Sequence, residues 1–332
     1  MRASGTELWA SEPFHRDVTA WVSDVARQHR IDLTGGAEQP HNRPWSSAIR
    51  YGSSAGSLWF KVNGPGTVHE PGLVAELARL VPDLGPEVLE VDIRRGWALT
   101  RDAGPTVRSL APPEELWPVW EEVLPRYAEA QLQLARHLDS LLDTRVPARR
   151  PAVLADEATR LVKDLADIDP AEGGLTADQV DALEAVLPAY RDWSAELSAS
   201  PVPDSLQHDD LHSGNVCRSA DGTLRIIDWG DASLGFPLAT LLVTLNSVAD
   251  AAGSGTEDPR VLRVRDAYLE PFTGLASRAE LVRYVDLARR CGCVTRALSW
   301  RGALTGEPAS THAAFGYPVR GWLLETLEVL EA

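Results

Sequence analysis

Lysine and cysteine are scarce in this chain of 332 residues. Its two lysines are Lys61 and Lys163, and its three cysteines are too few for a disulfide-stabilised fold. So little cysteine suits a reducing compartment, and we expect a cytoplasmic protein. No apolar run approaches the roughly 18 residues that a membrane span needs, and the first residues lack the apolar stretch of a signal peptide. The sequence therefore predicts a soluble globular protein with no membrane partner.

Positive charge is also in short supply, because 32 Lys and Arg residues stand against 48 Asp and Glu residues, a formal net charge of −16. Nucleic acids and anionic membranes require clustered positive charge, so this balance argues against both as partners. Residues 1–103 carry 11 basic and 13 acidic side chains, which leaves 21 basic and 35 acidic ones for residues 104–332. The acidic second segment favours a cationic small molecule, or simply provides a solubilising surface. Nothing in the sequence indicates an oligomeric state.

Hydrophobic spacing divides the chain into a small mixed segment and a larger helical one. In the first it predicts helices at 14–29 and 71–80, a turn at Gly35-Gly36, and strands at 48–52, 57–62, 87–91 and 97–100. In the second it predicts helices at 114–143, 153–167, 177–198, 238–251, 259–272, 279–297 and 319–330. We therefore expect an α+β fold with a small antiparallel-sheet lobe, residues 1–103, and a larger, mainly helical lobe, residues 104–332.

One polar segment, HDDLHSGNVCRSADGTLRIIDWGDA, interrupts the predicted helices. Asp221-Gly222 lies between two short apolar stretches and predicts a hairpin turn. Phosphoryl transfer needs a carboxylate that orients the attacking hydroxyl and accepts its proton, together with oxygen ligands for Mg²⁺. Asp210, Asn215 and Asp228 offer these groups, and a hairpin can bring its two ends to one metal ion. Turn formation and capping are the alternative roles for these residue types.

The stretches HDDLHSGN and RIIDWGDA resemble the H-G-D-L-H-x-x-N and I-D-W motifs of the aminoglycoside phosphotransferase and choline kinase-like family. This resemblance, over about residues 45–237, implies a bilobal protein-kinase-like fold that uses ATP and Mg²⁺. It implies that Asp210 is the catalytic aspartate and that Asn215 and Asp228 are the metal ligands. Asp209 departs from the pattern, because the family usually has Gly there. A changed loop conformation or an extra substrate-facing carboxylate would follow from it.

Lys61 and Glu70 extend the resemblance to the first lobe. Lys61 lies on an alternating strand, where the family has the lysine that neutralises nucleotide phosphates. Glu70 resembles the helix glutamate that holds this lysine, and Glu76 is the weaker candidate. A solvated strand lysine is the other interpretation of Lys61. The scarcity of lysine supports the functional one, because the planar guanidinium of arginine does not replace a compact ammonium on phosphates.

The remaining nucleotide contacts are expected at two further places in the first lobe. No G-x-G-x-x-G motif is present, so Ser46 and Ser47, in the segment NRPWSS, would contact phosphates through hydroxyl and backbone N–H groups. The segment WALTRDAG resembles the hinge between the lobes, at about residues 99–103. Its backbone at Thr100 and Asp102 would hydrogen-bond adenine.

The candidates for the acceptor site are Asp209, His212, Asp231, Trp300 and Trp322. His212 either positions its loop or contacts the substrate. Asp231 follows the metal-binding segment, where a capping role fits as well. The two tryptophans can stack on a sugar ring, although aromatic residues at helical spacing more often pack in the core.

The sequence thus predicts an ATP- and Mg²⁺-dependent kinase that phosphorylates a hydroxyl of a small molecule, with an amino sugar or aminoglycoside-like acceptor favoured by the acidic charge. A neutral sugar, a macrolide or a choline-like alcohol is the alternative acceptor. A metal-dependent hydrolase using the cluster around Asp209 and an inactive nucleotide-binding scaffold are the competing functions. A protein kinase is disfavoured, because no activation segment ending in A-P-E is recognisable.

Overall fold

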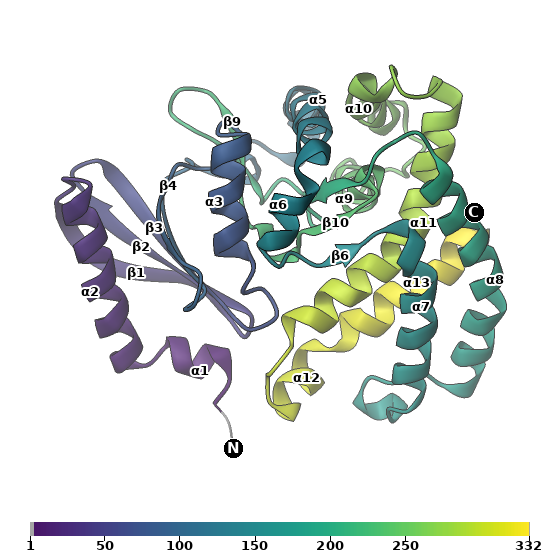
Figure 1. The fold of residues 1–332 in the computed structure, drawn as a ribbon, viewed down its shortest axis with the longest axis horizontal. Helices are drawn as coiled ribbons and strands as arrows, with labels where there is room; N and C mark the ends of the chain where they lie inside the picture. The colour runs from purple at the N-terminus through teal and green to yellow at the C-terminus, as the bar shows by residue number, and fades with distance from the viewer. Residues whose placement is uncertain (1–2, 332) are drawn as a thin grey trace. The chain divides into compact units, whose positions relative to one another are not determined.

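The computed structural model describes residues 3–331, with side chains as far as residue 327, and it forms two compact units (Figure 1). Unit 1 comprises the chain up to Pro105 together with Cys217–Gly230 and Gly302–Phe315. Unit 2 comprises Thr106–Val216, Asp231–Arg301 and the chain from Gly316 onward. Unit 1 therefore gathers segments that are far apart in the sequence. Each unit is described by itself.

Unit 1 is built on a five-stranded antiparallel sheet with the strand order β1-β2-β3-β5-β4. The strands are β1 (Leu33–Arg43), β2 (Ser46–Ser53), β3 (Gly56–Asn63), β4 (Val88–Asp92) and β5 (Trp97–Arg101). The helices are α1 (Gly5–Trp9), α2 (Glu12–Gln28), α3 (Glu70–Leu80) and α12 (Ala309–Phe315), and a separate hairpin pairs β8 (Val216–Arg218) with β9 (Leu224–Ile226). The strands and helices expected in residues 14–100 are confirmed, apart from the Gly35-Gly36 turn, and so is the hairpin around Asp221-Gly222.

Helix α2 begins where its sequence offers an N-terminal cap. The Ser11 hydroxyl accepts a hydrogen bond from the Phe14 amide, and a proline occupies the first turn, where its missing N–H costs nothing. The apolar face of α2 lies on the sheet (Figure 1), where the Phe14 ring is 6.3 Å from those of both Phe60 and Trp97. Burial of each large apolar side chain contributes about 1.5–3 kcal/mol, which makes this layer the core of unit 1.

The strand register assigns the other face of the sheet to polar side chains. Ala48 is paired with both His41 and Lys61, so all three project from the face opposite Phe60. Ser46 is two residues before Ala48 and shares the Lys61 face, whereas Ser47 projects toward α2. Because side chains alternate between the two faces of a strand, Ser46 and Ser47, which the sequence analysis predicts as a phosphate-binding pair, lie on opposite faces of the sheet.

Strand β1 is the main departure from the expected elements. Gly35 and Gly36, expected as a turn, lie inside β1, which pairs with β2 from Leu33↔Ser53 to Arg43↔Ser46 with two register shifts. Most of its side chains are exposed or only partly buried, and it is an edge strand, where Pro40 is tolerated. Pairing with β2 holds the segment extended although it lacks an alternating pattern, and only Pro44 and Trp45 remain as the turn.

Unit 2 is mainly helical, as expected. Its helices are α4 (Val107–Leu110), α5 (Trp117–Leu134), α6 (Leu138–Asp143), α7 (Pro151–Ala166), α8 (Ala177–Ala199), α9 (Leu241–Ala251), α10 (Pro259–Leu269), α11 (Arg278–Ala303) and α13 (Tyr317–Glu331). The single helix predicted at 114–143 is divided into α5 and α6 by a short 3₁₀ turn. A small sheet, in the order β6-β10-β7, joins β6 (Ala148–Arg149), β7 (Ser205–Gln207) and β10 (Ser233–Gly235).

Buried tyrosines join the helices of unit 2. The Tyr268 hydroxyl donates to the Gln131 side chain at 2.6 Å and lies 2.8 Å from the Pro237 carbonyl, and the Tyr190 hydroxyl donates to the Cys291 carbonyl. These hydrogen bonds satisfy polar groups that would be costly to bury alone. Between residues 3 and 331, no helix has both the length and the apolar composition to cross a membrane.

Candidate functional site

Lys61 is the centre of a charged cluster in unit 1. It projects from β3 toward Glu70, the first residue of α3, and its Nζ lies 2.6 Å from Glu70 Oε2. Nζ also lies 2.5 Å from Oδ1 of Asp228, which follows β9 in the chain. The Trp229 amide donates to Glu70 Oε1 at 2.9 Å, so Glu70 links Lys61 to the backbone that carries Asp228. Glu76 pairs with Arg79 instead.

Burial makes the charges of this cluster interdependent. The exposed fraction of the side chain is 5% for Glu70, 23% for Lys61 and 50% for Asp228. Burial opposes the Lys61 ammonium, but the Asp228 and Glu70 carboxylates outweigh this effect and raise the pKa of Lys61. Burial raises the pKa of Glu70 above its ordinary value, although the Lys61 ammonium opposes the shift. Lys61 therefore stays a protonated ammonium between the two carboxylates, with Asp228 at the exposed side of the cluster.

Asp228 adopts an uncommon backbone conformation. Its φ is +65°, in the left-handed region that costs a non-glycine residue about 1–2 kcal/mol. Two residues later, a Cβ on Gly230 would lie 3.2 Å from Glu70 Oε2, so the backbone passes close to the buried glutamate. The contacts of Glu70 and Lys61 hold this strained turn and direct the Asp228 carboxylate to Nζ.

The predicted phosphate-binding serines have different surroundings. The Ser46 hydroxyl lies 3.3 Å from His41 Nε2 on the Lys61 face, and the Ser47 hydroxyl donates to the His41 carbonyl on the α2 face. Burial lowers the pKa of His41, an effect that Asp228 opposes and that Lys61 and Arg43 reinforce. His41 is thus a neutral polar neighbour of Lys61 that the sequence did not indicate.

The predicted adenine contacts lie on and after β5. Thr100 is paired with Trp59 and shares the Lys61 face. The Asp102 amide donates to the Ser57 carbonyl at 3.2 Å, and the Asp102 carboxylate accepts from the Gly104 amide and the Trp59 indole. Asp102 therefore uses both its backbone N–H and its carboxylate to end the sheet.

Asp210 is the centre of a second cluster, in unit 2. Arg296, on α11, donates one hydrogen bond to Asp210 Oδ1 and another to Asp231 Oδ2, both at 3.0 Å. The Asn215 amide group donates to the Asp210 carbonyl at 2.9 Å and directs its amide oxygen elsewhere. The buried His208 accepts a hydrogen bond from the Asp210 amide through Nδ1. The structure thus brings Asp210, Asn215 and Asp231 together.

His212 positions the same loop. Its Nδ1 lies 3.1 Å from the Gly214 amide and 3.1 Å from the Arg108 guanidinium, which are both donors. An Nδ1 that accepts from two donors places the proton of a neutral imidazole on Nε2. Nε2 lies 3.6 Å from Asp210 Oδ2, so the imidazole N–H faces the second oxygen of this carboxylate.

Asp209 points into unit 2 and away from solvent. Its φ is +63°, the left-handed conformation for which the glycine of the family motif is suited, and the residue is only 5% exposed. Its Oδ2 accepts from the Ser233 hydroxyl at 2.5 Å and lies 3.6 Å from the Arg149 guanidinium. Burial raises the pKa of Asp209 to about 6, against the opposing charge of Arg149. Its carboxylate is a buried partner of arginine.

The two tryptophans proposed for the acceptor site, Trp300 and Trp322, lie near Arg296. Trp322, on α13, lies under the Arg296 guanidinium, with Cζ 5.7 Å from the ring centre. Trp300 is half-buried on α11, four residues after Arg296. No sequence pattern indicates a role for Arg296 or Arg149, because each is one of many arginines and neither lies near the Asp210 motif along the chain.

Among the side chains that the structure describes, residues 3–327, no group of three or more His, Cys, Asp or Glu is arranged to hold a metal ion. Asn215 and Asp228 carry oxygen donors, the ligand type that Mg²⁺ prefers, and Mg²⁺ commonly takes only one or two protein ligands beside phosphates and water. The donor chemistry of these two residues therefore fits Mg²⁺. They belong to different units, Asp228 to unit 1 and Asn215 to unit 2.

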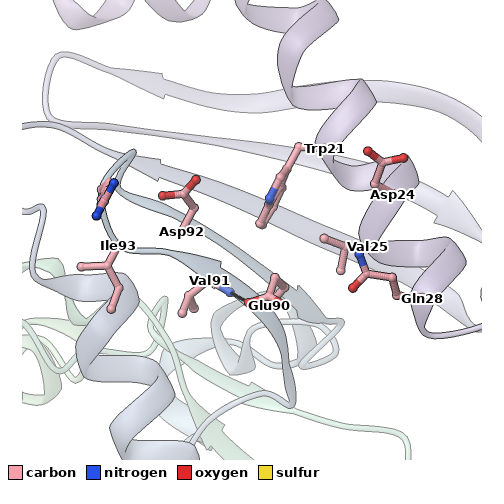
Figure 2. A pocket seen from close by; sticks show the side chains of 9 residues that line it. Trp21, Asp24, Val25, Gln28, Glu90, Val91, Asp92 and Ile93 are labelled. Carbon is pink, nitrogen blue, oxygen red and sulfur yellow. Dashed lines mark hydrogen bonds between the residues drawn. The ribbon is translucent and has the colours of Figure 1, made fainter.

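A cavity of about 470 Å³ lies on the face of the unit 1 sheet opposite Lys61, and Figure 2 shows its lining. Trp21 and Val25 reach it from α2, and Val91 reaches it from β4. The Trp21 ring is 5.6 Å from that of Trp97, in the core layer opposite Lys61. Of its acidic lining residues Asp24, Glu90 and Asp92, Asp24 pairs with Arg27 and Asp92 with Arg95. The cavity therefore does not belong to the Lys61 cluster.

A family model identifies the family of this chain. The sequence model of the phosphotransferase enzyme family matches residues 73–281, more than half of the chain. A sequence search of curated proteins finds no match.

Among solved structures, an ethanolamine kinase from Plasmodium vivax has 13% identity and a TM-score of 0.58, over 96% of this chain and 90% of that one. A macrolide 2′-phosphotransferase from Brachybacterium faecium has 17% identity and a TM-score of 0.56, over 90% and 97%. A spectinomycin phosphotransferase in complex with ADP and spectinomycin has 12% identity and a TM-score of 0.50, over 94% and 97%. These likenesses confirm the expected protein-kinase-like α+β fold.

The Asp209–Arg149 pair predicts how this chain responds to the glycine of the motif. In the Asp209→Gly variant, relief of the left-handed backbone contributes about 1 kcal/mol, but leaving Arg149 buried without its carboxylate costs about 3–5 kcal/mol. We therefore expect the free energy of unfolding, measured by urea denaturation, to fall by about 2–4 kcal/mol. The double variant Asp209→Gly/Arg149→Met should recover at least half of this loss. A double variant that is less stable than Asp209→Gly would show that the two residues are not coupled.

Proposed function

Because the chain belongs to the phosphotransferase enzyme family, we propose that it transfers the γ-phosphoryl group of ATP to a hydroxyl group of a small molecule, with Mg²⁺ as the metal. The family makes the protein a small-molecule phosphotransferase. The family does not specify the nucleotide, the metal or the acceptor, so these three are what we propose. The observation that carries the nucleotide assignment is the Lys61 cluster, in which a partly buried ammonium is held between Glu70 and Asp228.

The Lys61 cluster is suited to nucleotide phosphates. A phosphate chain carries several negative charges, and a pre-formed ammonium in a partly buried site binds it without first being ordered. Glu70 fixes the position of Nζ, and Asp228 extends from the cluster toward solvent. The solved spectinomycin phosphotransferase, which shares the fold, contains ADP. We therefore assign the nucleotide to the unit 1 residues Ser46, Lys61, Glu70, Thr100 and Asp102. Ser47 is left out of this assignment, because its buried hydroxyl donates to the His41 carbonyl on the α2 face of the sheet. Unit 1 includes all of the predicted lobe of residues 1–103.

The Asp210 cluster is suited to the acceptor. In the proposed reaction the acceptor oxygen forms a bond to the γ-phosphorus, the bond from this phosphorus to the β-phosphate bridging oxygen breaks, and the acceptor proton passes to Asp210. Asn215 and Asp228 are the proposed ligands of Mg²⁺, which when bound neutralises charge on the phosphates. His212, Asp231, Trp300 and Trp322 are the acceptor-side candidates, whereas the burial of Asp209 against Arg149 favours a structural role for it.

An amino sugar or aminoglycoside-like molecule is the proposed acceptor. The support is the acidic excess in residues 104–332, which would concentrate a cationic substrate. Macrolides, ethanolamine and spectinomycin, named for proteins of the same fold, provide the comparison set, together with a neutral sugar and choline. A metal-dependent hydrolase is disfavoured, because Arg149 and Ser233 engage the Asp209 carboxylate that such a site would use.

The first test is ATP turnover against a panel of acceptors that includes amino sugars, aminoglycosides, neutral sugars, macrolides and choline-like alcohols. With the best acceptor, Asp210→Ala should lower kcat by about 10²–10⁴-fold, because positioned proton transfer contributes a factor of that size. Binding of an ATP analogue should stay within twofold of wild type. Wild-type turnover in Asp210→Ala would refute the mechanism, and ATP binding without transfer to any acceptor would favour an inactive scaffold.

The proposed metal ligand predicts a change in Mg²⁺ dependence. Asp228→Asn removes the anionic oxygen, so we expect at least tenfold more Mg²⁺ to be needed for half-maximal turnover at saturating ATP. The matched control is Asp221→Asn, which removes an exposed carboxylate from the β8–β9 turn of the same unit. Its Mg²⁺ requirement should equal that of wild type. Equal requirements in all three proteins would exclude Asp228 as a ligand.

A further inference from the structure

Arg296 joins two carboxylates that lie 21 positions apart in the sequence. Its two terminal nitrogens each donate to a different aspartate, Asp210 Oδ1 and Asp231 Oδ2, both at 3.0 Å. The Arg296 side chain is 5% exposed, whereas those of Asp210 and Asp231 are 28% and 27% exposed. The guanidinium therefore holds the two carboxylates from the protein side, and both carboxylates reach solvent.

The surroundings of Arg296 keep its guanidinium in place. Trp322 packs against it, and its buried Nε has no hydrogen-bond partner among the described residues. A buried guanidinium stays charged, and here the Asp231 and Asp210 carboxylates outweigh burial and raise its pKa. Because this cation is stabilised mainly by these two aspartates, their positions and its own depend on each other.

A second arginine fixes the segment of α11 that carries Arg296. Arg149 donates to the Thr295 carbonyl at 3.2 Å and to the Ser299 hydroxyl, and it also faces Asp209. Asp209 and Asp210 are neighbours in the chain, so each is linked to α11 through a different arginine. The segment that carries Asp209 and Asp210 is thereby connected to α11 at two points.

We propose that Arg296 is a positioning residue for phosphoryl transfer, which it supports by holding the Asp210 carboxylate in the orientation that accepts the acceptor proton. This inference rests on the proposed function. Arg296 binds Oδ1, so the proton is assigned to Oδ2, the oxygen that His212 Nε2 faces at 3.6 Å. Asp231 is the second anchor, which keeps the guanidinium from rotating away from Asp210. Holding a reacting group in a productive orientation is worth large factors in rate, and a misplacement of 1 Å can cost about 10²-fold.

The test compares Arg296→Lys with wild type on the best acceptor. Lysine keeps the charge but cannot donate to both carboxylates with the fixed fork of a guanidinium. We expect kcat to fall about 10–100-fold, with KM for ATP and for the acceptor within threefold, and with the concentration of nucleotide-binding sites unchanged. Arg301→Lys is the matched control, because Arg301 is on the same helix and pairs with Asp164 at the surface. Its kcat should equal that of wild type.

Asp231→Asn provides a second variant that leaves Arg296 and Asp210 in place. We expect a kcat loss of about 3–10-fold with an unchanged KM for ATP, and a double variant Arg296→Lys/Asp231→Asn no slower than Arg296→Lys alone, because both changes disrupt one interaction. Losses that multiply in the double variant would overturn the proposal. So would unchanged kcat in either single variant, or a rise of the acceptor KM alone, which would make these residues acceptor contacts. Absence of transfer by the wild-type protein to any acceptor would instead refute the proposed function.

Discussion

The ion pairs of Lys61 are the interaction on which unit 1 depends. Lys61 joins β3 to the first residue of α3 through Glu70 and to the chain after β9 through Asp228. Glu70 is the buried partner, so loss of the Lys61 ammonium would leave its carboxylate uncompensated inside unit 1, whereas solvent screens the half-exposed Asp228 carboxylate. The sheet, the helix and the distant segment 217–230 are therefore connected at one ammonium group, and the strained backbone of Asp228 is held by the same contacts.

The two units use the same device with different cations. In unit 1 an ammonium lies between Glu70 and Asp228, and in unit 2 the Arg296 guanidinium lies between Asp210 and Asp231. The difference fits the chemistry proposed for each. A compact ammonium can contact phosphate oxygens as a point charge, whereas the planar fork of arginine fixes the directions of two carboxylates. Lys61 thus provides a positive charge in unit 1, and Arg296 orients two carboxylates in unit 2.

Local signals predicted the elements around the site, and long-range contacts decided the rest. Alternation along β3 and the Asp221-Gly222 turn depend on neighbouring residues, so they could be found in the sequence. Pairing with β2 keeps β1 extended despite Gly35-Gly36, which no local pattern shows. Arg296 meets Asp210 across 86 positions of sequence. The replacement of glycine by Asp209 was visible, but its burial against an arginine depends on the tertiary fold.

The most direct measurement is the affinity of the protein for Mg²⁺·ATP in variants of its two lysines, determined by isothermal titration calorimetry. Lys61→Ala should bind at least tenfold more weakly than wild type, because it removes the cation that faces the phosphates. Lys163→Ala, which removes the exposed lysine near the end of α7, should bind as wild type does. Equal affinities of the two variants would contradict the assignment of the Lys61 cluster to the nucleotide.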